Sequence, residues 1–333
     1  MRALLLKAPR LLEPADLPRP ELLAGQVRVR VRKVGICGSD YSSIAGKLPF
    51  TRFPIVPGHE AAGVVLEAAD PFAWKPGDRV LIHPILCRRD DPAFARGEVH
   101  HSESTEVLGV VSRNGAYAEE VVVEDYMLRR TPDGVDDEAA AMVEPVAVAV
   151  HACQRGALRP RDRVLAFGAG NIGLLAIQAA RALGAGRVVV TDLVPEKLAL
   201  ARELGVDEAI DARGGLPAGP LEKQFDLVID GVGNEQSVHD ALTACARGGR
   251  IVVYGVPPGD ISFPLKVAFS KDVSLITCRL YGADFDLAIR LVAESRVRVK
   301  ETITHRVRLD DAPALISRII DGQERAVKVM ITP

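Results

Sequence analysis

The sequence lacks a long apolar run, an excess of charge of one sign and an even set of cysteines. No stretch reaches the roughly 18 consecutive apolar residues that a membrane-spanning helix needs, and the first residues lack the apolar core and cleavage site of a signal peptide. The 42 Lys and Arg residues against 44 Asp and Glu residues leave a formal charge of -2, which excludes the basic footprint of a nucleic-acid-binding protein. The five cysteines are scattered. They argue against a disulfide framework, and we expect a reducing, cytoplasmic location.

The composition that remains is that of an ordinary globular protein. Hydrophobic residues make up 48% and charged residues 26% of the 333 residues, which excludes a disordered or fibrous chain. At roughly 150 residues per domain, this length predicts about two domains. We expect neither a nucleic acid nor a membrane among its partners.

The first part of the chain has the pattern of a mainly β domain. Residues 26–34 (QVRVRVRKV) alternate strictly, which is typical of a strand with one face in water. Short apolar runs punctuated by Pro and Gly follow, without regular helices between them. The polar segment 88–106 predicts a loop or lobe that projects from this domain.

From about residue 147 the pattern changes to alternating strands and helices. Apolar runs such as RVVVTDL and FDLVIDGVG alternate with helical segments such as NIGLLAIQAARALGAG. This alternation is typical of βαβ units in a doubly wound parallel sheet, the Rossmann arrangement. Because the pattern breaks near residue 275, we predict an α/β protein in which a Rossmann domain at 147–275 interrupts a discontinuous domain at 1–146 and 276–333.

A glycine-rich turn follows the first strand of this second domain. Gly168, Gly170 and Gly173 form GxGxxG directly after an apolar run and at the start of a helix, as a dinucleotide-binding turn requires. Asp192 ends the next strand, where a carboxylate binds a ribose diol and repels a 2′-phosphate, which favours NAD over NADP. The predicted cofactor-binding residues are Gly168, Gly170, Asn171, Ile172, Gly173 and Asp192. The alternatives are a turn without a ligand, or the nucleotide-like ligand of a methyltransferase.

Four residues of the first domain are candidate metal ligands, namely Cys37, His59, Glu60 and Glu144. Each has an ordinary structural alternative, such as a buried thiol or a solvated carboxylate. Both glutamates, however, stand among apolar neighbours, where an unpaired carboxylate is costly to bury. A thiolate, an imidazole and one or two carboxylates form a suitable zinc shell with room for water or substrate. Their spacing is not a local zinc motif and by itself supports zinc only weakly.

Several segments in a fixed order resemble those of one known family. GICGSD, PGHEAAGVV, NGAYAEEVVV, EPVAVAVHA, GAGNIG and KVMI are similar to segments of the zinc-containing medium-chain dehydrogenase/reductases, most closely of the sorbitol (polyol) dehydrogenase branch. This resemblance implies a GroES-like catalytic domain, a Rossmann domain and an active site in the cleft between them. It also implies one catalytic zinc ion held by Cys37 and His59, with Glu60 and Glu144 completing or exchanging in its shell.

Two departures from the family pattern concern metal content and substrate. The family's second, structural zinc is held by four cysteines, and the matching positions here are Cys87, Asp90, Ala93 and His101. We therefore expect no structural zinc. Where the family commonly has a His and a Tyr after GSD and one further residue, this chain has Ser42 and Ser43. A proton-relay His and a substrate-facing Tyr are thus missing, which predicts a pocket different from that for sorbitol.

The resemblance also assigns roles in proton transfer and substrate binding. Ser39 resembles the family's hydroxyl relay, and Arg279 resembles an arginine that contacts the active-site water and the polyol. Their alternatives are a turn hydroxyl and a surface ion pair. Glu60 or Glu144 could take up a proton when displaced from the metal. The predicted catalytic residues are therefore Ser39, Glu60, Glu144 and Arg279.

Four other polar residues in or beside the matching segments receive supporting roles. Asp40 is expected to orient a ligand or the neighbouring backbone. His151, His305 and Lys328 are expected to be structural.

These observations predict a zinc-dependent oxidoreductase that transfers a hydride between NAD and a secondary alcohol of a polyol, sugar or sugar acid. Two alternatives stay open: a threonine-type amino-alcohol dehydrogenase of the same fold, and a non-catalytic dinucleotide-binding scaffold. Retention of both the phosphate turn and the metal residues favours an enzyme. Because the family forms dimers and tetramers, we expect a homodimer or homotetramer, with strand 250–256 or segment 261–269 at the contact.

Overall fold

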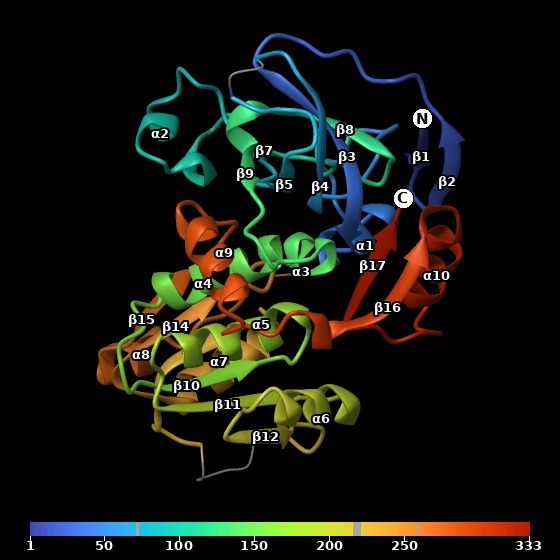
Figure 1. Cartoon of the computed structure of the whole chain (residues 1–333). Coiled ribbons are helices and arrows are strands. Elements are labelled where there is room, and N and C mark those ends of the chain that lie inside the picture. Colours follow the sequence, from blue (N-terminus) through green and yellow to red (C-terminus); the bar gives the residue numbers. More distant parts are fainter. Residues whose placement is uncertain (71–72, 216–220, 258) are drawn as a thin grey trace. The chain divides into compact units, whose positions relative to one another are not determined.

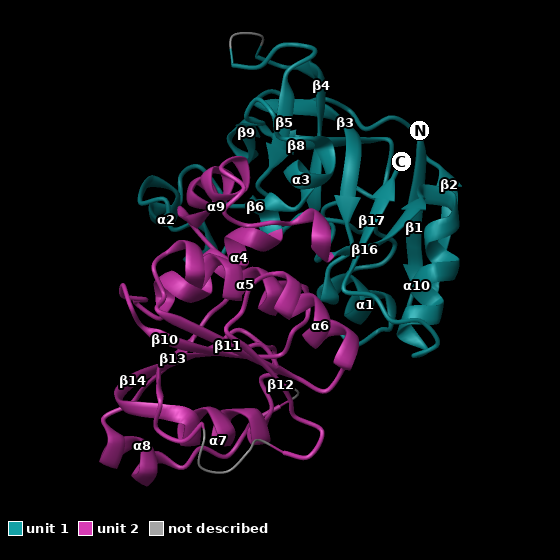
Figure 2. Cartoon of the chain, turned by 60° about the horizontal axis from the view of Figure 1, so that its bottom comes forward, with its two compact units in different colours: residues 1–144, 303–333 teal, residues 145–302 magenta. Residues whose placement is uncertain are grey.

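The computed structural model describes residues 1–70, 73–215, 221–257 and 259–333 and divides into two compact units. Unit 1 comprises residues 1–144 and 303–333, and unit 2 comprises residues 145–302 (Figure 2). Unit 1 is therefore assembled from two segments that are far apart in the sequence. No helix of the described residues is long and apolar enough to cross a membrane.

Unit 1 is built mainly of strands. They are β1 (Arg2–Ala8), β2 (Leu11–Asp16), β3 (Gln26–Gly35), β4 (Glu60–Ala68), β5 (Arg79–Ile82), β6 (Ile85–Leu86), β7 (Glu106–Val107), β8 (Glu120–Glu124), β9 (Leu128–Arg130), β16 (Ile303–Arg308) and β17 (Lys328–Thr332). Its helices are α1 (Gly38–Ile44), α2 (Pro92–Ala95), α3 (Asp137–Ala141) and α10 (Ala312–Ile320). The main sheet has the order β16-β17-β3-β4-β5-β9, and β8 also pairs with β3.

The predicted strand at 26–34 is the centre of this sheet, as β3. It pairs with β4 along one edge and with β8 and then β17 along the other. Its valines are buried, but the prediction of one water-exposed face is wrong for its first half, where Arg28 is only 6% exposed. The Arg28 guanidinium donates to the Pro20 carbonyl at 2.6 Å and contacts Glu67. These partners compensate for the loss of hydration when the charge is buried.

The last strand of unit 1 comes from the far end of the sequence. In Figure 1 the red strands β16 and β17 lie beside the blue strand β3. Met330 pairs with Gly35 and Ile331 with Val34 in antiparallel register. Consequently, the residues that open β17 lie close to the end of β3.

The segment 88–106 forms a small lobe containing α2 and a 3-10 turn at Val99–His101. Its base is tied by the Tyr126 hydroxyl, which accepts from the Cys87 N–H at 3.1 Å and donates to the Cys87 carbonyl at 2.9 Å. Asp91 caps α2 by accepting from the Ala93 N–H at 2.8 Å. The side chains at the positions of the family's structural zinc have other contacts here, since Asp90 pairs with Arg88 and His101 stacks on His100.

Unit 2 alternates strands and helices, as the sequence predicts. Its elements are α4 (Val143–Arg155, whose first two residues belong to unit 1), β10 (Arg163–Phe167), α5 (Asn171–Ala182), β11 (Arg187–Asp192), α6 (Pro195–Glu203), β12 (Glu208–Asp211), β13 (Phe225–Asp230), α7 (Glu235–Ala244), β14 (Cys245–Val253), α8 (Leu265–Lys271), β15 (Ser274–Thr277) and α9 (Asp284–Ala293). The strands form one parallel sheet in the order β12-β11-β10-β13-β14-β15. This order confirms the predicted doubly wound fold, with α5 and α6 packed on β10 to β12 and α7 and α8 on β13 and β14.

Two details of unit 2 differ from the sequence-based predictions. Residues 276–302, assigned to the first domain, lie in unit 2 because β15 extends its sheet and His151 on α4 contacts Asp284 of α9 at 2.8 Å. The segment 250–256, expected at an oligomer contact, lies mostly in β14, which pairs with β13 and with β15 and so is inside the sheet. The outer strand at this end of the sheet is β15, and β12 is the outer strand at the other end.

Candidate functional site

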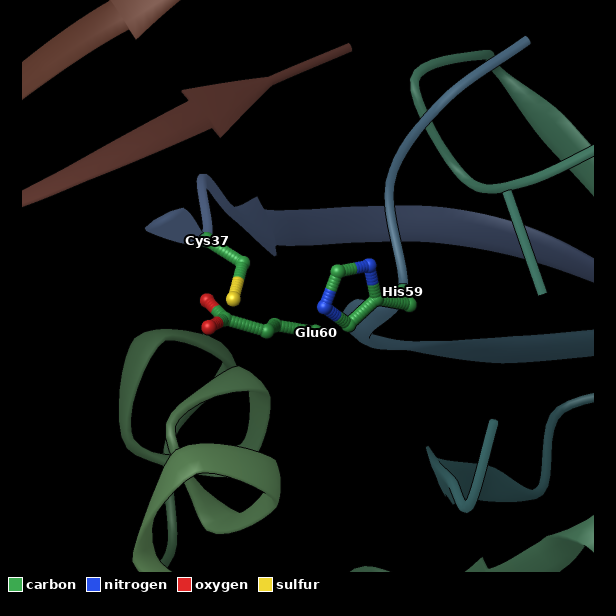
Figure 3. Close-up of side chains that lie close together, drawn as sticks. All are labelled: Cys37, His59 and Glu60. Carbon is green, nitrogen blue, oxygen red and sulfur yellow. The ribbon is translucent and has the colours of Figure 1, made fainter. Parts of the chain in front are cut away.

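Three predicted metal ligands lie together in unit 1. The Cys37 sulfur, a ring nitrogen of His59 and a carboxylate oxygen of Glu60 all lie within 4.8 Å of one another, and the three side chains converge in Figure 3. The pairing of β3 with β4 explains this convergence, because it sets Gly35 opposite Glu60 and brings Cys37 close to the start of β4. His59 is 4% exposed and Glu60 is completely buried.

Glycine at residue 35 leaves room for this arrangement. A Cβ atom there would lie 2.2 Å from Oε2 of Glu60. The missing side chain thus leaves the space that the Glu60 carboxylate occupies. Because Glu60 is also completely buried, its carboxylate is part of the packing of the sheet and not a surface group.

The charge around His59 tests whether a cation fits this cluster. Burial lowers the pKa of His59, but the Asp40 carboxylate and the Cys37 thiol outweigh burial, so the pKa lies well above its usual range. His59 Nδ1 is buried and has no hydrogen-bond partner among the described residues, and Asp40 Oδ1 lies 3.6 Å from it. An excess of negative charge and a thiol, imidazole and carboxylate donor set fit a zinc ion.

Asp40 supports the cluster through its contacts with Cys37 and His59. It is 1% exposed, and its Oδ2 accepts from the Cys37 N–H and from the Tyr117 hydroxyl, both at 2.8 Å. Burial raises its pKa, while His59 and these two donors oppose that shift. Since Asp40 also faces His59, one carboxylate orients both the thiol-bearing backbone and the imidazole.

The fourth candidate ligand, Glu144, lies near the cluster but outside the group within 4.8 Å. It is 7% exposed in the first turn of α4. Its charge contributes to the raised pKa of both His59 and Lys328.

The other two predicted catalytic residues, Ser39 and Arg279, are less buried than His59 and Glu60. Ser39 is half-buried in the first turn of α1, two residues after Cys37. Arg279 is exposed after β15, in unit 2. Their assignments as relay and substrate ligand stay predictions.

Sequence analysis missed one residue that contacts the cluster. Lys328, expected to be structural, is buried and places its ammonium against both carboxylate oxygens of Glu60. The available signal was a lysine at the head of an apolar strand, KVMIT. That signal does not identify the partner, which lies 268 residues away along the chain.

The predicted dinucleotide turn has the required backbone geometry in unit 2. Gly168 has φ of 90°, a conformation that favours glycine. A Cβ at Gly173 would lie 1.9 Å from the Gly168 carbonyl oxygen, so the helix packs directly on the turn. At Gly170 a Cβ would meet nothing within 4 Å. The open side of the turn is therefore at Gly170, which also begins α5 as its N-cap.

Asp192 ties this turn to the next strand. Its two carboxylate oxygens accept from the Ala169 N–H at 2.7 Å and from the Val194 N–H at 2.8 Å. Its side chain also lines a cavity of about 540 Å³ at the carboxyl ends of the parallel strands, together with Gly168 and Lys197. This is the edge at which such sheets bind nucleotides.

Two other predicted cofactor-binding residues open α5. The amide nitrogen and oxygen of Asn171 are buried without a hydrogen-bond partner in the described part of the chain. Ile172 is half-buried. An unpaired buried amide is costly, so the start of α5 fits a polar ligand.

Comparison with known proteins gives consistent results for both units. Residues 23–133 match the family described as alcohol dehydrogenase GroES-like domain, and residues 171–294 match zinc-binding dehydrogenase. The chain is 34% identical to a probable D-xylulose reductase A of Arthroderma otae, over 95% of this chain and 92% of the relative. It is 32% identical to L-idonate 5-dehydrogenase of Vitis vinifera, over 86% and 82%.

A solved structure resembles the whole chain. It is an alcohol dehydrogenase of E. coli CFT073 in complex with NADH, with a TM-score of 0.92 and 28% identity over 100% of this chain and 99% of that one. The similarity covers the elements that carry Cys37, His59 and the glycine turn alike.

Proposed function

Because the chain belongs to the zinc-containing medium-chain dehydrogenase/reductase family, in its polyol dehydrogenase branch, we propose that it transfers a hydride between NAD and a secondary alcohol of a polyol, sugar or sugar acid. The observation that carries this proposal is the convergence of Cys37, His59 and Glu60. The relatives named above support the substrate class, since xylulose is a sugar and idonate a sugar acid.

Residues of unit 1, together with Arg279 of unit 2, have distinct roles in the proposed reaction. Cys37 and His59 would hold zinc, with Glu60 or Glu144 as the carboxylate ligand. Bound zinc would supply a Lewis acid, which lowers the pKa of a bound alcohol as it lowers that of water from about 16 to about 7. Asp40 keeps the thiolate and imidazole oriented, and Ser39 passes the alcohol proton outward. Arg279 binds the polyol.

The experiment that tests this function combines metal analysis with a substrate screen. We expect about one zinc ion per chain after purification without added metal, and NAD reduction with at least one polyol or sugar acid. Turnover with threonine alone would instead support the amino-alcohol alternative. Absence of zinc, with no turnover on any substrate after zinc is added, would contradict the proposal and favour a non-catalytic scaffold.

We propose NAD rather than NADP as the cofactor because Asp192 lines the cavity beside the glycine turn. A carboxylate accepts hydrogen bonds from a ribose diol and repels a 2′-phosphate. Asp192→Asn keeps the shape of the side chain and removes its charge. We expect this change to shift the ratio of NADPH to NADH affinity about tenfold toward NADPH, which corresponds to about 1.4 kcal/mol.

Fluorescence titration of each reduced cofactor measures this ratio. The half-buried Asp240, which lines the same cavity, provides the matched control as Asp240→Asn, for which we expect a smaller shift. Tighter binding of NADPH than of NADH by the unmodified protein would refute the assignment.

We propose that the protein is a homo-oligomer whose copies meet at the edge patch, defined here as Val256, Leu265, Phe269 and Leu275. These side chains are 85%, 70%, 86% and 41% exposed, and they lie after β14, on α8 and on the outer strand β15. An open strand edge beside exposed apolar side chains favours pairing with a second copy.

We also propose a cytoplasmic location for the protein. The five cysteines support this proposal, because all of them are free thiols.

Phe269→Glu is expected to separate these copies. A charge at a site from which water is excluded costs 2 kcal/mol or more, so the dissociation constant of the dimer should rise about 30-fold or more. Light scattering after size-exclusion chromatography over a concentration series gives this constant. Phe50→Glu changes another exposed phenylalanine, 51% accessible and in unit 1, and should leave assembly unchanged. A Phe269→Glu protein with an unaltered dissociation constant would exclude the edge patch as the contact.

A further inference from the structure

The Lys328 ammonium is buried and uses all three of its donors. Lys328 is 3% exposed, and its Nζ lies 2.8 Å from Glu60 Oε1, 2.6 Å from Glu60 Oε2 and 2.9 Å from the Ile36 carbonyl oxygen. The pairing of β17 with β3 delivers it there, because Met330 stands opposite Gly35. The Ile36 carbonyl, one residue before Cys37, fixes the ammonium at the base of the cluster.

This contact gives the Glu60 carboxylate a partner that Cys37 and His59 do not share. The Asp40 carboxylate accepts from the Cys37 backbone N–H, and it also faces His59. Glu60, in contrast, directs both of its oxygens at a cation of the protein itself. An oxygen that binds zinc has to divide its charge between the metal and the ammonium.

A cation beside a metal site has a second effect. It repels a divalent ion electrostatically, and burial strengthens that repulsion because little water screens it. The competition for the Glu60 oxygens acts on the bond between Glu60 and the metal, whereas the repulsion acts on the ion as a whole. The competition therefore leaves the thiolate and imidazole as the firmer ligands.

Resting on the zinc-dependent function proposed above, we propose that Lys328 is a positioning residue that makes Glu60 a displaceable zinc ligand. Lys328 holds the carboxylate when it leaves the metal, so the vacated position is available to an alcohol. The lysine itself touches neither the alcohol nor the cofactor. When Glu60 is on Lys328, the metal has one protein ligand fewer. When Glu60 is on the metal, that ligand position is filled.

Lys328→Met tests this role, because methionine fills similar volume without charge. We expect the variant to bind zinc at least tenfold more tightly, since Glu60 then has no competing cation, and to lose turnover because the carboxylate is no longer displaced. Competition with a chromophoric chelator gives the zinc dissociation constant. The visible spectrum of the cobalt-substituted protein reports a change in coordination independently of activity.

Two further variants keep the test decisive. In a Glu60→Gln background, Lys328→Met should tighten zinc binding much less than in the unmodified protein, because only the general repulsion remains once the carboxylate for which the lysine competes is gone. Lys328→Arg keeps the charge and should not tighten zinc binding. If the single Lys328→Met variant does not fold, the double variant removes both buried charges together, and its comparison with Glu60→Gln and with Lys328→Arg replaces it.

The outcomes separate this inference from the proposed function. Zinc binding and turnover by the unmodified protein, with Lys328→Met unchanged or weaker in zinc affinity, would overturn the role of Lys328 alone. An equal effect of Lys328→Met with and without the Glu60 carboxylate would also overturn it, because the lysine would then act through general charge. Failure of the unmodified protein to bind zinc would remove the proposed function and the inference together.

Discussion

Cys37→Ser removes bound zinc and lowers kcat/KM for alcohol oxidation by more than about 100-fold. Changes to the outer partners of a zinc ligand already cost 10- to 100-fold, and this change replaces a ligand itself. A serine hydroxyl is not ionised near neutral pH, whereas a thiol beside a metal is. Elemental analysis and steady-state kinetics on the same preparation measure the two losses together.

Cys87→Ser is the matched control for this prediction. Cys87 is buried at the base of the lobe, where its backbone contacts Tyr126, and it is not part of the group formed by Cys37, His59 and Glu60. We expect it to keep its zinc and its activity. Loss of one zinc ion in Cys87→Ser would mean that the lobe binds a second metal, and full zinc content in Cys37→Ser would contradict the catalytic site.

Gly173→Ala and Gly170→Ala are both expected to weaken NADH binding by 100-fold or more, for different reasons. At residue 173 a Cβ would overlap the Gly168 carbonyl, 1.9 Å away, so the turn and α5 have to separate. At residue 170 a Cβ meets no protein atom within 4 Å and blocks only an approaching pyrophosphate. NADH fluorescence titration measures both effects.

The free protein distinguishes the two glycines. We expect Gly173→Ala to lose about 2 kcal/mol or more of unfolding free energy through overpacking, whereas Gly170→Ala should stay within about 0.5 kcal/mol. Denaturant unfolding without cofactor measures this difference. Normal NADH affinity in Gly170→Ala would show that the pyrophosphate does not approach the turn at that residue.

The fold was predictable from the sequence where a local pattern repeats. The alternation of strands and helices after residue 147 predicts the parallel sheet, and GAGNIG marks its ligand-binding turn without any long-range information. Arg28 was not predictable in the same way. An alternating strand indicates one exposed face, but the partners that bury this guanidinium, Pro20 and Glu67, lie on neighbouring segments.

The site was predictable only in its individual ligands. Cys37, His59 and Glu60 were recognisable from short motifs, but their convergence depends on the register that sets Gly35 against Glu60. Lys328 depends on a second register, that of β17 with β3. No periodicity in the sequence records such pairings. Likewise, α9 and β15 join unit 2 through contacts that local pattern does not reveal.

The split composition of unit 1 has a consequence for folding during synthesis. A chain is made in order, so residues 145–302 emerge from the ribosome before β16 and β17 exist. Until then Val34 and Gly35 at the end of β3 pair with β4 on one side but have no neighbour on the other, and Glu60 has no ammonium beside it. A growing chain therefore carries an open sheet edge and an acid without its cationic partner until its final strands dock. Unit 1, whose synthesis begins first, therefore completes its fold after unit 2.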